Sequence, residues 1–439
     1  MRDCEEMVLR VLVTGATGLI GSAVIACLHA AGHEVVGLVR RADGEADRLP
    51  VQHLIALDIA RAVNPADWLP HLQGVDALVN CAGVLQDGPQ DSTAGVHSAG
   101  VAALFAACEQ AGFRRVIHFS AIGVDRETPT AFSRSKLQGD QALMTRDLDW
   151  VILRPSVVVG ASAYGGSALF RGLAALPMLP VAPGTGLLQV VQLEDVTRTV
   201  LFFLQPNAPA RVTFELAGPR RLSMTDIAQS YRHWLGGRPA PPLPLPGWLS
   251  HLMYRAGDFA GWLGWRPPMR TTARREIVRG AVGDPAEWTR MTGIDPRDLD
   301  SALAMRPASV QERWFANLYL LKALGFAVFV AFWIGTGIVS LTIGWNIGKE
   351  LMFRGGVPDP WASLTVIAGA LADILIGIAI AVRRTARYGL YAALAISVAY
   401  TIIGTVLVPE LWADPLGPML KIWPVMAFNL MLLAILEDR

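Results

Sequence analysis

The stretch Val11–Val24, VLVTGATGLIGSAV, decides the fold. An apolar run ending at Thr14 precedes three spaced glycines, and a second apolar run follows them. Glycines at this spacing let the chain turn tightly from a strand into a helix and let its backbone approach a pyrophosphate, which the helix amino end favours. The sequence therefore predicts a dinucleotide-binding turn. The residues expected to contact the cofactor there are Gly15, Thr17, Gly18, Leu19, Ile20 and Gly21.

Short runs of Val, Ile and Leu alternate with helix-length segments from Val8 to about Ser156. Each run is apolar throughout, as expected for strands that are covered on both faces. The pattern predicts an α/β domain with a Rossmann-type parallel sheet. Looser sequence then continues to about Arg232 and predicts a smaller substrate-side portion, so that residues 1–236 form one domain.

The composition indicates a membrane protein, because 52% of the 439 residues are hydrophobic and only 17% are charged. Four apolar segments, 318–345, 361–382, 388–408 and 416–436, each reach the ~20 residues needed to cross a bilayer. Residues 317–439 are therefore predicted to form an all-α domain of four transmembrane helices.

Basic residues predict the orientation of this domain. Arg383, Arg384 and Arg387 cluster in the second loop, whereas the third loop carries only acidic residues. The positive-inside rule places the second loop, and hence both termini, in the cytoplasm. The charged amino terminus has no apolar core of a signal peptide, which agrees with a multi-pass protein of the inner (cytoplasmic) membrane.

One carboxylate, Asp373, lies inside a predicted span. An ionisable residue at that depth is costly, so it is expected to face the bundle interior or a polar cavity. It is either a functional residue or the partner in a hydrogen bond between helices.

Between the two domains, residues 237–316 are predicted to be a linker. The run GRPAPPLPLPGW, at 237–248, is too rich in proline for a helix or a central strand. The following run at 247–265, GWLSHLMYRAGDFAGWLGW, is rich in Trp and Leu. It is either a buried helix of the substrate domain or a helix lying in the membrane interface.

Charge and cysteine content exclude some classes of partner and site. The net charge of +1 gives no indication of nucleic-acid binding. The four cysteines are scattered, without metal-ligand spacing, so neither a metal site nor a disulfide framework is predicted. These cysteines are Cys4, Cys27, Cys81 and Cys108.

Two arginines, Arg40 and Arg41, follow the second predicted strand, where an acidic residue usually binds the free ribose of NAD. Arginines suit a 2′-phosphate, which favours NADP, with NAD as the alternative.

The motifs TGATGLIG, LVRR, ALDI, NCAG, SRSK and LRPSVVVG occur in an order that resembles the extended and atypical short-chain dehydrogenases/reductases. The resemblance covers about 9–232 and is nearest to the epimerase-like group around the nucleotide-binding accessory subunit of respiratory complex I. It implies that Asp58 lies by the adenine, that Asn80, Ala82 and Gly83 line the cofactor, and that Lys136 holds the nicotinamide ribose. It also implies that Arg154, Pro155 and Asp195 edge the substrate cleft.

The carboxyl-terminal part, with ADPLGPMLKIWPVMAFNLMLLAILEDR, is similar to the DoxX-like membrane family. Relatives of that family lie beside quinone-linked redox chemistry, so the resemblance suggests a quinone. The sequence itself does not distinguish a quinone from a lipid or a partner subunit as the ligand of the four spans.

The catalytic positions raise a question about activity. In such reductases a serine holds the carbonyl oxygen, a tyrosine supplies a proton and a lysine lowers the tyrosine pKa. Ser120 and Lys136 stand at the required spacing, but Phe132 replaces the tyrosine. Loss of the acid costs about 10²- to 10⁴-fold in rate, so ordinary ketone reduction should be slow or absent.

Three hypotheses follow from this replacement. The domain binds NADP(H) only as a structural, assembly or sensing ligand; or it passes hydride to an acceptor that needs no acid, such as a flavin or quinone; or the membrane domain is the active part. Tyr164 is either a substitute proton donor or a loop aromatic that closes the cleft.

Overall fold

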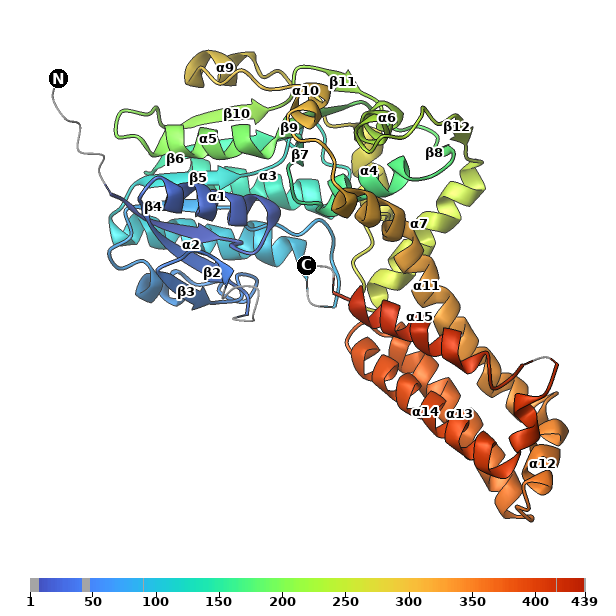
Figure 1. The fold of residues 1–439 in the computed structure, drawn as a ribbon. Coiled ribbons are helices and arrows are strands. Elements are labelled where there is room, and N and C mark those ends of the chain that lie inside the picture. Colours follow the sequence, from blue (N-terminus) through green and yellow to red (C-terminus); the bar gives the residue numbers. More distant parts are fainter. Residues whose placement is uncertain (1–7, 42–47, 90, 416, 438–439) are drawn as a thin grey trace. The chain divides into compact units, whose positions relative to one another are not determined.

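The computed structural model describes residues 8–41, 48–89, 91–415 and 417–437 (Figure 1). Cys4 and Leu416 lie outside these ranges. The chain divides into two compact units: Met1–Asp258 with Pro267–Asn317, and Phe259–Arg266 with Leu318–Arg439. The segment predicted as a linker, 237–316, is thus shared between the units, and most of it folds with the first.

The first unit is built on a sheet of seven parallel strands in the order β10-β6-β5-β4-β1-β2-β3. Its strands are β1 (Arg10–Thr14), β2 (Glu34–Val39), β3 (His53–Ala56), β4 (Ala77–Asn80), β5 (Arg115–Phe119), β6 (Asp149–Pro155) and β10 (Val212–Leu216). Strands β1 to β6 lie in the spatial order β3-β2-β1-β4-β5-β6, which is that of a Rossmann fold. The predicted parallel α/β sheet is therefore confirmed.

Helices cover both faces of this sheet because successive strand residues point to opposite sides. Val11 and Val13 pack with α1 (Leu19–Ala30) and α5 (Leu193–Leu204) in one buried cluster. Leu12 and Leu78 pack with α2 (Gly100–Ala111) and α3 (Ala131–Met144) in the other. The apolar runs of the sequence are therefore strands buried on both faces.

The smaller portion of the first unit contains a three-stranded and a two-stranded sheet. Its elements are β7 (Val157–Val159), α4 (Gly165–Ala174), β8 (Leu179–Val181), β9 (Leu188–Gln192), β11 (Arg221–Leu222), α6 (Met224–Trp234), β12 (Pro242–Pro244), α8 (Thr271–Arg279) and α10 (Leu299–Ala304). Helix α9 (Ala286–Thr292) packs instead on the seven-stranded sheet, because its Trp288 lies in the same buried cluster as Val11 and Val13. The proline-rich run supplies β12, which pairs only with β8, as proline allows at a sheet edge. Helix α7 (Gly247–Trp262) follows it.

The second unit is helical. Its elements are α11 (Val310–Leu341), which begins in the first unit, α12 (Trp345–Arg354), α13 (Trp361–Ala381), α14 (Ala386–Leu407) and α15 (Ile422–Ala434). Among the described residues, three helices are long and apolar enough to cross a membrane: α11, α13 and α14.

The prediction of a fourth membrane-spanning helix is not confirmed. Helix α15 has 13 residues, which corresponds to about 20 Å, whereas the hydrocarbon core is about 30 Å thick. Pro415 and Pro418 flank Gly417, whose φ is 58°, and the helix begins only at Ile422. These residues interrupt the apolar segment that composition alone presents as continuous.

Close packing of α11 against α13 depends on small residues. A Cβ atom added at Gly337 would lie 2.5 Å from the carbonyl oxygen of Ala370. At Gly377 it would lie 2.5 Å from Cγ1 of Ile334. Glycines of this kind let helix backbones approach each other in a bilayer.

We predict that Gly337→Ala destabilises the second unit, because its Cβ would overlap a backbone oxygen that cannot move without shifting α13. The cost of such overpacking is about 1–3 kcal/mol, measurable as a lower thermal midpoint in detergent. Gly335→Ala, two residues earlier on α11, is the matched control, since nothing lies within 4 Å of its added Cβ. Equal midpoints for the two variants would contradict the proposed close approach.

Candidate functional site

The glycine turn joins the carboxyl end of β1 to the amino end of α1. Gly15 has a φ of 65°, and a Cβ there would lie 2.9 Å from the backbone of Ala82 after β4. A Cβ at Gly21 would lie 2.2 Å from the Gly15 carbonyl oxygen. Both positions therefore require glycine. Gly18 is the N-cap of α1, and Thr17, Leu19 and Ile20 are half-buried around it.

A row of polar side chains crosses the carboxyl edge of the sheet, on the face covered by α2 and α3. Thr14, Asn80 and His118 occupy matching positions of neighbouring strands. The Thr14 hydroxyl donates to Oδ1 of Asn80 (2.5 Å), and the Asn80 amide group donates to Nδ1 of His118 (2.8 Å). His118 Nδ1 is thus an acceptor, so the ring proton sits on Nε2, 3.5 Å from the Asp140 carboxylate.

Asp140 ends this row in a buried ion pair. Two nitrogens of Arg154 donate to its Oδ2, at 3.1 and 3.0 Å, and a third donates to Asp125 at 2.5 Å. Burial alone would raise the pKa of Asp140, but His118, Ser120 and Arg154 together lower it. Arg154, which the resemblance places at the substrate cleft, is therefore already paired with two carboxylates.

Lys136 lies one helical turn before Asp140 on α3. Its ammonium donates to the carbonyl oxygens of Phe119 (2.8 Å), the last residue of β5, and Ala82 (3.3 Å), which follows β4. Burial lowers the pKa of Lys136 to about 8, although Asp140 and Cys81 act in the opposite direction. An ammonium has three N–H bonds, so one donor is left for a ligand.

Ser120 follows β5 beside this lysine. Its amide donates to the Leu153 carbonyl (2.8 Å), and the side chain is buried. Its hydroxyl lies near enough to the Asp140 carboxylate to help lower the pKa of that group, but among the described residues it makes no hydrogen bond of good geometry. A buried hydroxyl whose hydrogen bonding is incomplete is what a bound polar group would satisfy.

The ring of Phe132 packs edge to face against His97, with 5.5 Å between centroids. His97 comes from a π-helical turn, η4 (Gly95–Ala99), which no sequence motif predicts. Its Nε2 accepts from the Val84 amide (2.9 Å), and its Nδ1 donates to the Ser135 hydroxyl (3.0 Å). Turns of this type often occur at functional sites.

His97 is not a substitute acid. Burial, Lys136 and His118 together lower its pKa to about 2, so the ring stays neutral. Its one N–H group donates a hydrogen bond to the Ser135 hydroxyl, which in turn donates to the Phe132 carbonyl (3.0 Å). His97 therefore positions the amino-terminal turn of α3 that carries Phe132.

Other predicted site residues have local partners. Tyr164 is the N-cap of α4, and its backbone bonds to Ser167. Pro155 ends β6, and its carbonyl accepts from Ile122 (3.1 Å). Asp195 is buried at the start of α5, which raises its pKa, and it accepts from the Arg297 amide (3.3 Å).

The residues predicted to bind the adenosine half lie at the ends of β2 and β3. Arg40 and Arg41 are exposed, and Arg40 pairs with Asp91 at 2.8 Å. Asp58 accepts from the Ala60 amide (3.1 Å), which shapes the turn after β3. Gly83 lies beside Lys136, since an added Cβ would be 3.5 Å from its Nζ.

Helix α8, from the segment predicted as a linker, also reaches the site. The carboxylate of Glu276 accepts from the hydroxyls of Thr130 and Ser133, on either side of Phe132. Glu276 also pairs with Arg279 (2.9 Å), which donates to the Ile122 carbonyl (3.0 Å). These bonds fasten α8 across the loop that follows β5.

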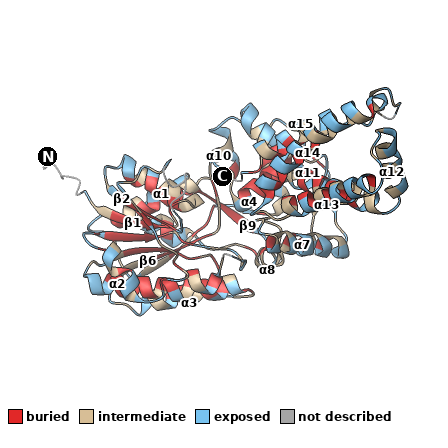
Figure 2. Ribbon diagram, turned by 90° about the horizontal axis from the view of Figure 1, so that it is seen from below, coloured by how far each residue is buried: buried red, intermediate tan, exposed pale blue. Residues whose placement is uncertain are grey.

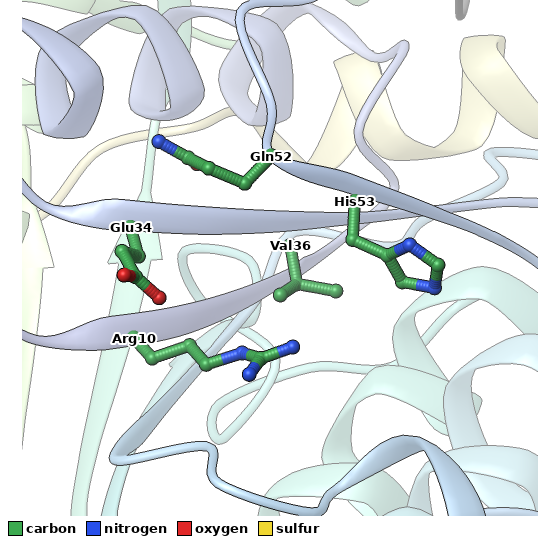
Figure 3. A pocket seen from close by; sticks show the side chains of 5 residues that line it. All are labelled: Arg10, Glu34, Val36, Gln52 and His53. Carbon is green, nitrogen blue, oxygen red and sulfur yellow. The ribbon is translucent and has the colours of Figure 1, made fainter.

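A hollow of ≈ 410 Å³ lies elsewhere on the first unit, lined by Arg10, Glu34, Val36, Gln52 and His53 (Figure 3). Arg10, Glu34 and His53 begin β1, β2 and β3. The hollow is therefore at the amino edge of the sheet, opposite the glycine turn, whereas α/β sheets bind their ligands at the carboxyl edge. It is not part of the candidate site.

In the second unit, Asp373 faces the helix bundle and is 7% exposed. Its carboxylate accepts from Tyr400 of α14 (3.0 Å) and lies 3.4 Å from the Thr336 hydroxyl of α11. The hydrogen bond between helices that the sequence offered as one explanation is thus present. No cluster of metal-ligating residues occurs in the described parts of either unit.

We predict that Lys136→Met weakens the binding of NADH or NADPH by about 10- to 100-fold, the usual value of a charge-assisted hydrogen bond. Stability should be unchanged or higher, because a buried charge is removed. Fluorescence titration and thermal unfolding measure the two effects. Arg134→Met, an exposed basic position on the same helix, should change neither, and equal losses of affinity in both variants would contradict the assignment.

The lowered pKa of Lys136 also predicts opposite pH trends for binding and stability. Above pH 8 the free protein loses the Lys136 proton, so NADPH affinity should fall, by at most about tenfold per pH unit. Between about 8 and the ordinary value of 10.5 the unfolded chain binds more protons, so this group makes stability rise with pH. Lys136→Met should lose both trends; retention of either in that variant would assign it to another group.

Comparison with known proteins agrees with this geometry. The NAD(P)H-binding family matches residues 15–169, and the DoxX-like family matches residues 330–430. An uncharacterised protein of Mycobacterium tuberculosis is 29% identical over 54% of this chain, which spans about a quarter (24%) of that protein's length. The crystal structure of the Bordetella bronchiseptica enzyme WbmG in complex with NAD shares the fold, with a TM-score of 0.55, 18% identity and coverage of 72% of this chain and 98% of that one.

Several relatives are named as reductases. The ceramide reductase of Caulobacter vibrioides is 27% identical and matches 55% of this chain and 75% of its own. The 3-diazoavenalumate denitrifying reductase of a Streptomyces species is 30% identical and matches 59% of this chain and 96% of its own. The chain therefore belongs to the epimerase-like, NAD(P)H-binding short-chain dehydrogenases/reductases, and it carries a DoxX-like membrane domain at its carboxyl side.

Proposed function

We propose that the protein is a membrane-anchored NADP(H)-dependent oxidoreductase that passes hydride to an acceptor needing no proton from the position of Phe132. The observation that carries this proposal is that Lys136 and Ser120 are both buried and both keep hydrogen-bonding capacity. Lys136 keeps a charged donor in a buried site, and the buried Ser120 hydroxyl makes no hydrogen bond of good geometry among the described residues. A site kept only for packing would satisfy such groups internally.

The residues fit a nicotinamide dinucleotide. Gly15 and Gly21 allow the backbone to approach the pyrophosphate, and Lys136 has a donor for the nicotinamide ribose. Arg40 and Arg41 are exposed where a 2′-phosphate would lie, which supports NADP over NAD. The bound cofactor would supply the hydride.

Phe132 restricts the acceptor. Reduction of a ketone makes an alkoxide, which needs an acid at the position where Phe132 has only a ring. Reduction of a quinone makes a phenolate-type anion, which is far less basic and can take its proton from water. The only N–H group of the neighbouring His97 ring is hydrogen-bonded to Ser135 and is not available to a substrate. The described residues around Phe132 therefore favour a quinone over a ketone as the acceptor.

A membrane-resident acceptor agrees with the second unit and with the name of one relative. Three apolar helices provide the anchor, and one of the reductase relatives is named for ceramide, a lipid. A lipid-soluble quinone is the acceptor that meets both conditions, solubility in the bilayer and independence from an acid.

The second candidate is nucleotide binding without turnover, as in a structural, assembly or sensing subunit. The replacement of tyrosine by Phe132 and the fixed tautomer of His97 favour it, because both remove a proton donor from the site. The presence of Lys136 agrees with either function, because a protein that binds the nucleotide without turnover would also use its ammonium group.

We predict that the solubilised protein oxidises NADPH when a short-chain quinone is added, but not when a simple ketone is added. Absorbance of the reduced nicotinamide measures both reactions. Phe132→Tyr should add ketone reduction, by about 10²-fold or more over wild type, and leave quinone reduction within a fewfold. The control Lys136→Met should lower both.

Tight NADPH binding without oxidation by the quinone would contradict the redox proposal and support the second candidate. Ketone reduction by the wild-type protein would contradict the argument from Phe132.

A further inference from the structure

Helix α7 carries large apolar side chains that face away from the protein. Trp248, Leu252, Phe259 and Trp262 are 69%, 57%, 61% and 70% exposed. At 3.6 residues per turn they fall within an arc of about 80°, so they form one face of the helix. The rings of Phe259 and Trp262 stack, with 5.9 Å between centroids. Figure 2 marks exposed residues along this helix.

The opposite face of α7 is buried. Ser250 and Tyr254 are 2% and 5% exposed. A Cβ at Gly257 would lie 1.8 Å from the Met269 carbonyl oxygen, so the helix backbone packs directly against the chain that follows it. Helices on the surface of soluble proteins usually carry polar residues on the face that is turned outward. An outer face of large apolar residues therefore indicates a surface that has a partner.

The carboxyl end of α7 is part of the membrane unit. Trp265, just beyond it, donates to the carbonyl of Ala381 (2.7 Å), the last residue of the candidate span α13. The guanidinium of Arg383 stacks over the Trp265 ring at 5.5 Å from its centroid. The end of a span, with tryptophan and arginine side by side, is the level at which a helix leaves the hydrocarbon core.

We propose that the outer face of α7, formed by Trp248, Leu252, Phe259 and Trp262, lies in the headgroup region of the bilayer. Tryptophan and phenylalanine are favoured at that depth, where a helix lies in the plane of the membrane. The partner is therefore the lipid surface, in continuity with the membrane unit that contains residues 259–266.

Arg255 favours the lipid surface, rather than a second copy of the chain, as the partner of this face. It is exposed and lies near the middle of the apolar face. Charged residues are depleted from the centre of interfaces between proteins. At a bilayer surface the same guanidinium meets lipid phosphates, so a central arginine suits anionic lipid. The proposal concerns this surface alone and does not depend on the proposed reaction.

The test is depth measurement in proteoliposomes with the full chain. Single cysteines replace Trp248, Leu252, Phe259 or Trp262 in a background without the four native cysteines, and each is labelled with an environment-sensitive nitrobenzoxadiazole fluorophore. The vesicles contain phosphatidylcholine and phosphatidylglycerol, with or without lipids that carry a nitroxide quencher near the headgroup. Val63→Cys, at an exposed apolar position of the first unit, is the matched control.

The expected result is blue-shifted emission at all four α7 positions and at least about twofold stronger quenching by nitroxide lipid than at Val63. Emission typical of water at these positions would overturn the proposal. Blue-shifted emission without lipid quenching would also overturn it, because the face would then be covered by protein. Thermal unfolding of each labelled variant shows that the chain remains folded.

Discussion

The ammonium group of Lys136, held in the dry interior by two backbone carbonyls, is the interaction on which the first unit's site depends. A buried charge is costly unless its hydrogen bonds are satisfied. The carbonyls of Phe119, the last residue of β5, and Ala82, which follows β4, satisfy two of them. The lysine thus ties α3 to the carboxyl edge of the sheet, the edge that also carries the glycine turn, and leaves one donor for a ligand.

The rest of the polar row follows from this placement. Asp140, one turn further along α3, meets His118 and Arg154, so the helix is fixed at two points. Between His97 and Glu276, the first turn of α3 is held from both sides, and it carries Phe132. The proposed site thus has the lysine and serine expected of a reductase and a phenylalanine at the position of the acid, and this combination is the reason to propose an acceptor that does not require one.

The parts of the structure with a local cause could be predicted from the sequence. The glycine turn and the strands buried on both faces have short-range signatures, and so do α11, α13 and α14. What could not be predicted depends on tertiary contacts. No local sequence pattern predicts the π-helical turn of His97 or the hydrogen bonds between Glu276 of α8 and the first turn of α3. Helix α15 is shorter than its apolar composition suggests. The outward aromatic face of α7 was one of two interpretations, because the sequence does not show which side of a helix is covered.

A single-turnover measurement tests the central claim most directly. NADPH and its 4-deuterated form are bound to the solubilised protein, and a short-chain quinone is mixed in a stopped-flow instrument. Direct hydride transfer predicts rapid oxidation with a primary isotope effect, slower for the deuterated cofactor by about twofold or more if transfer limits the step. Oxidation that is absent, or no faster than without protein, would contradict the account and leave a domain that binds the nucleotide without using it.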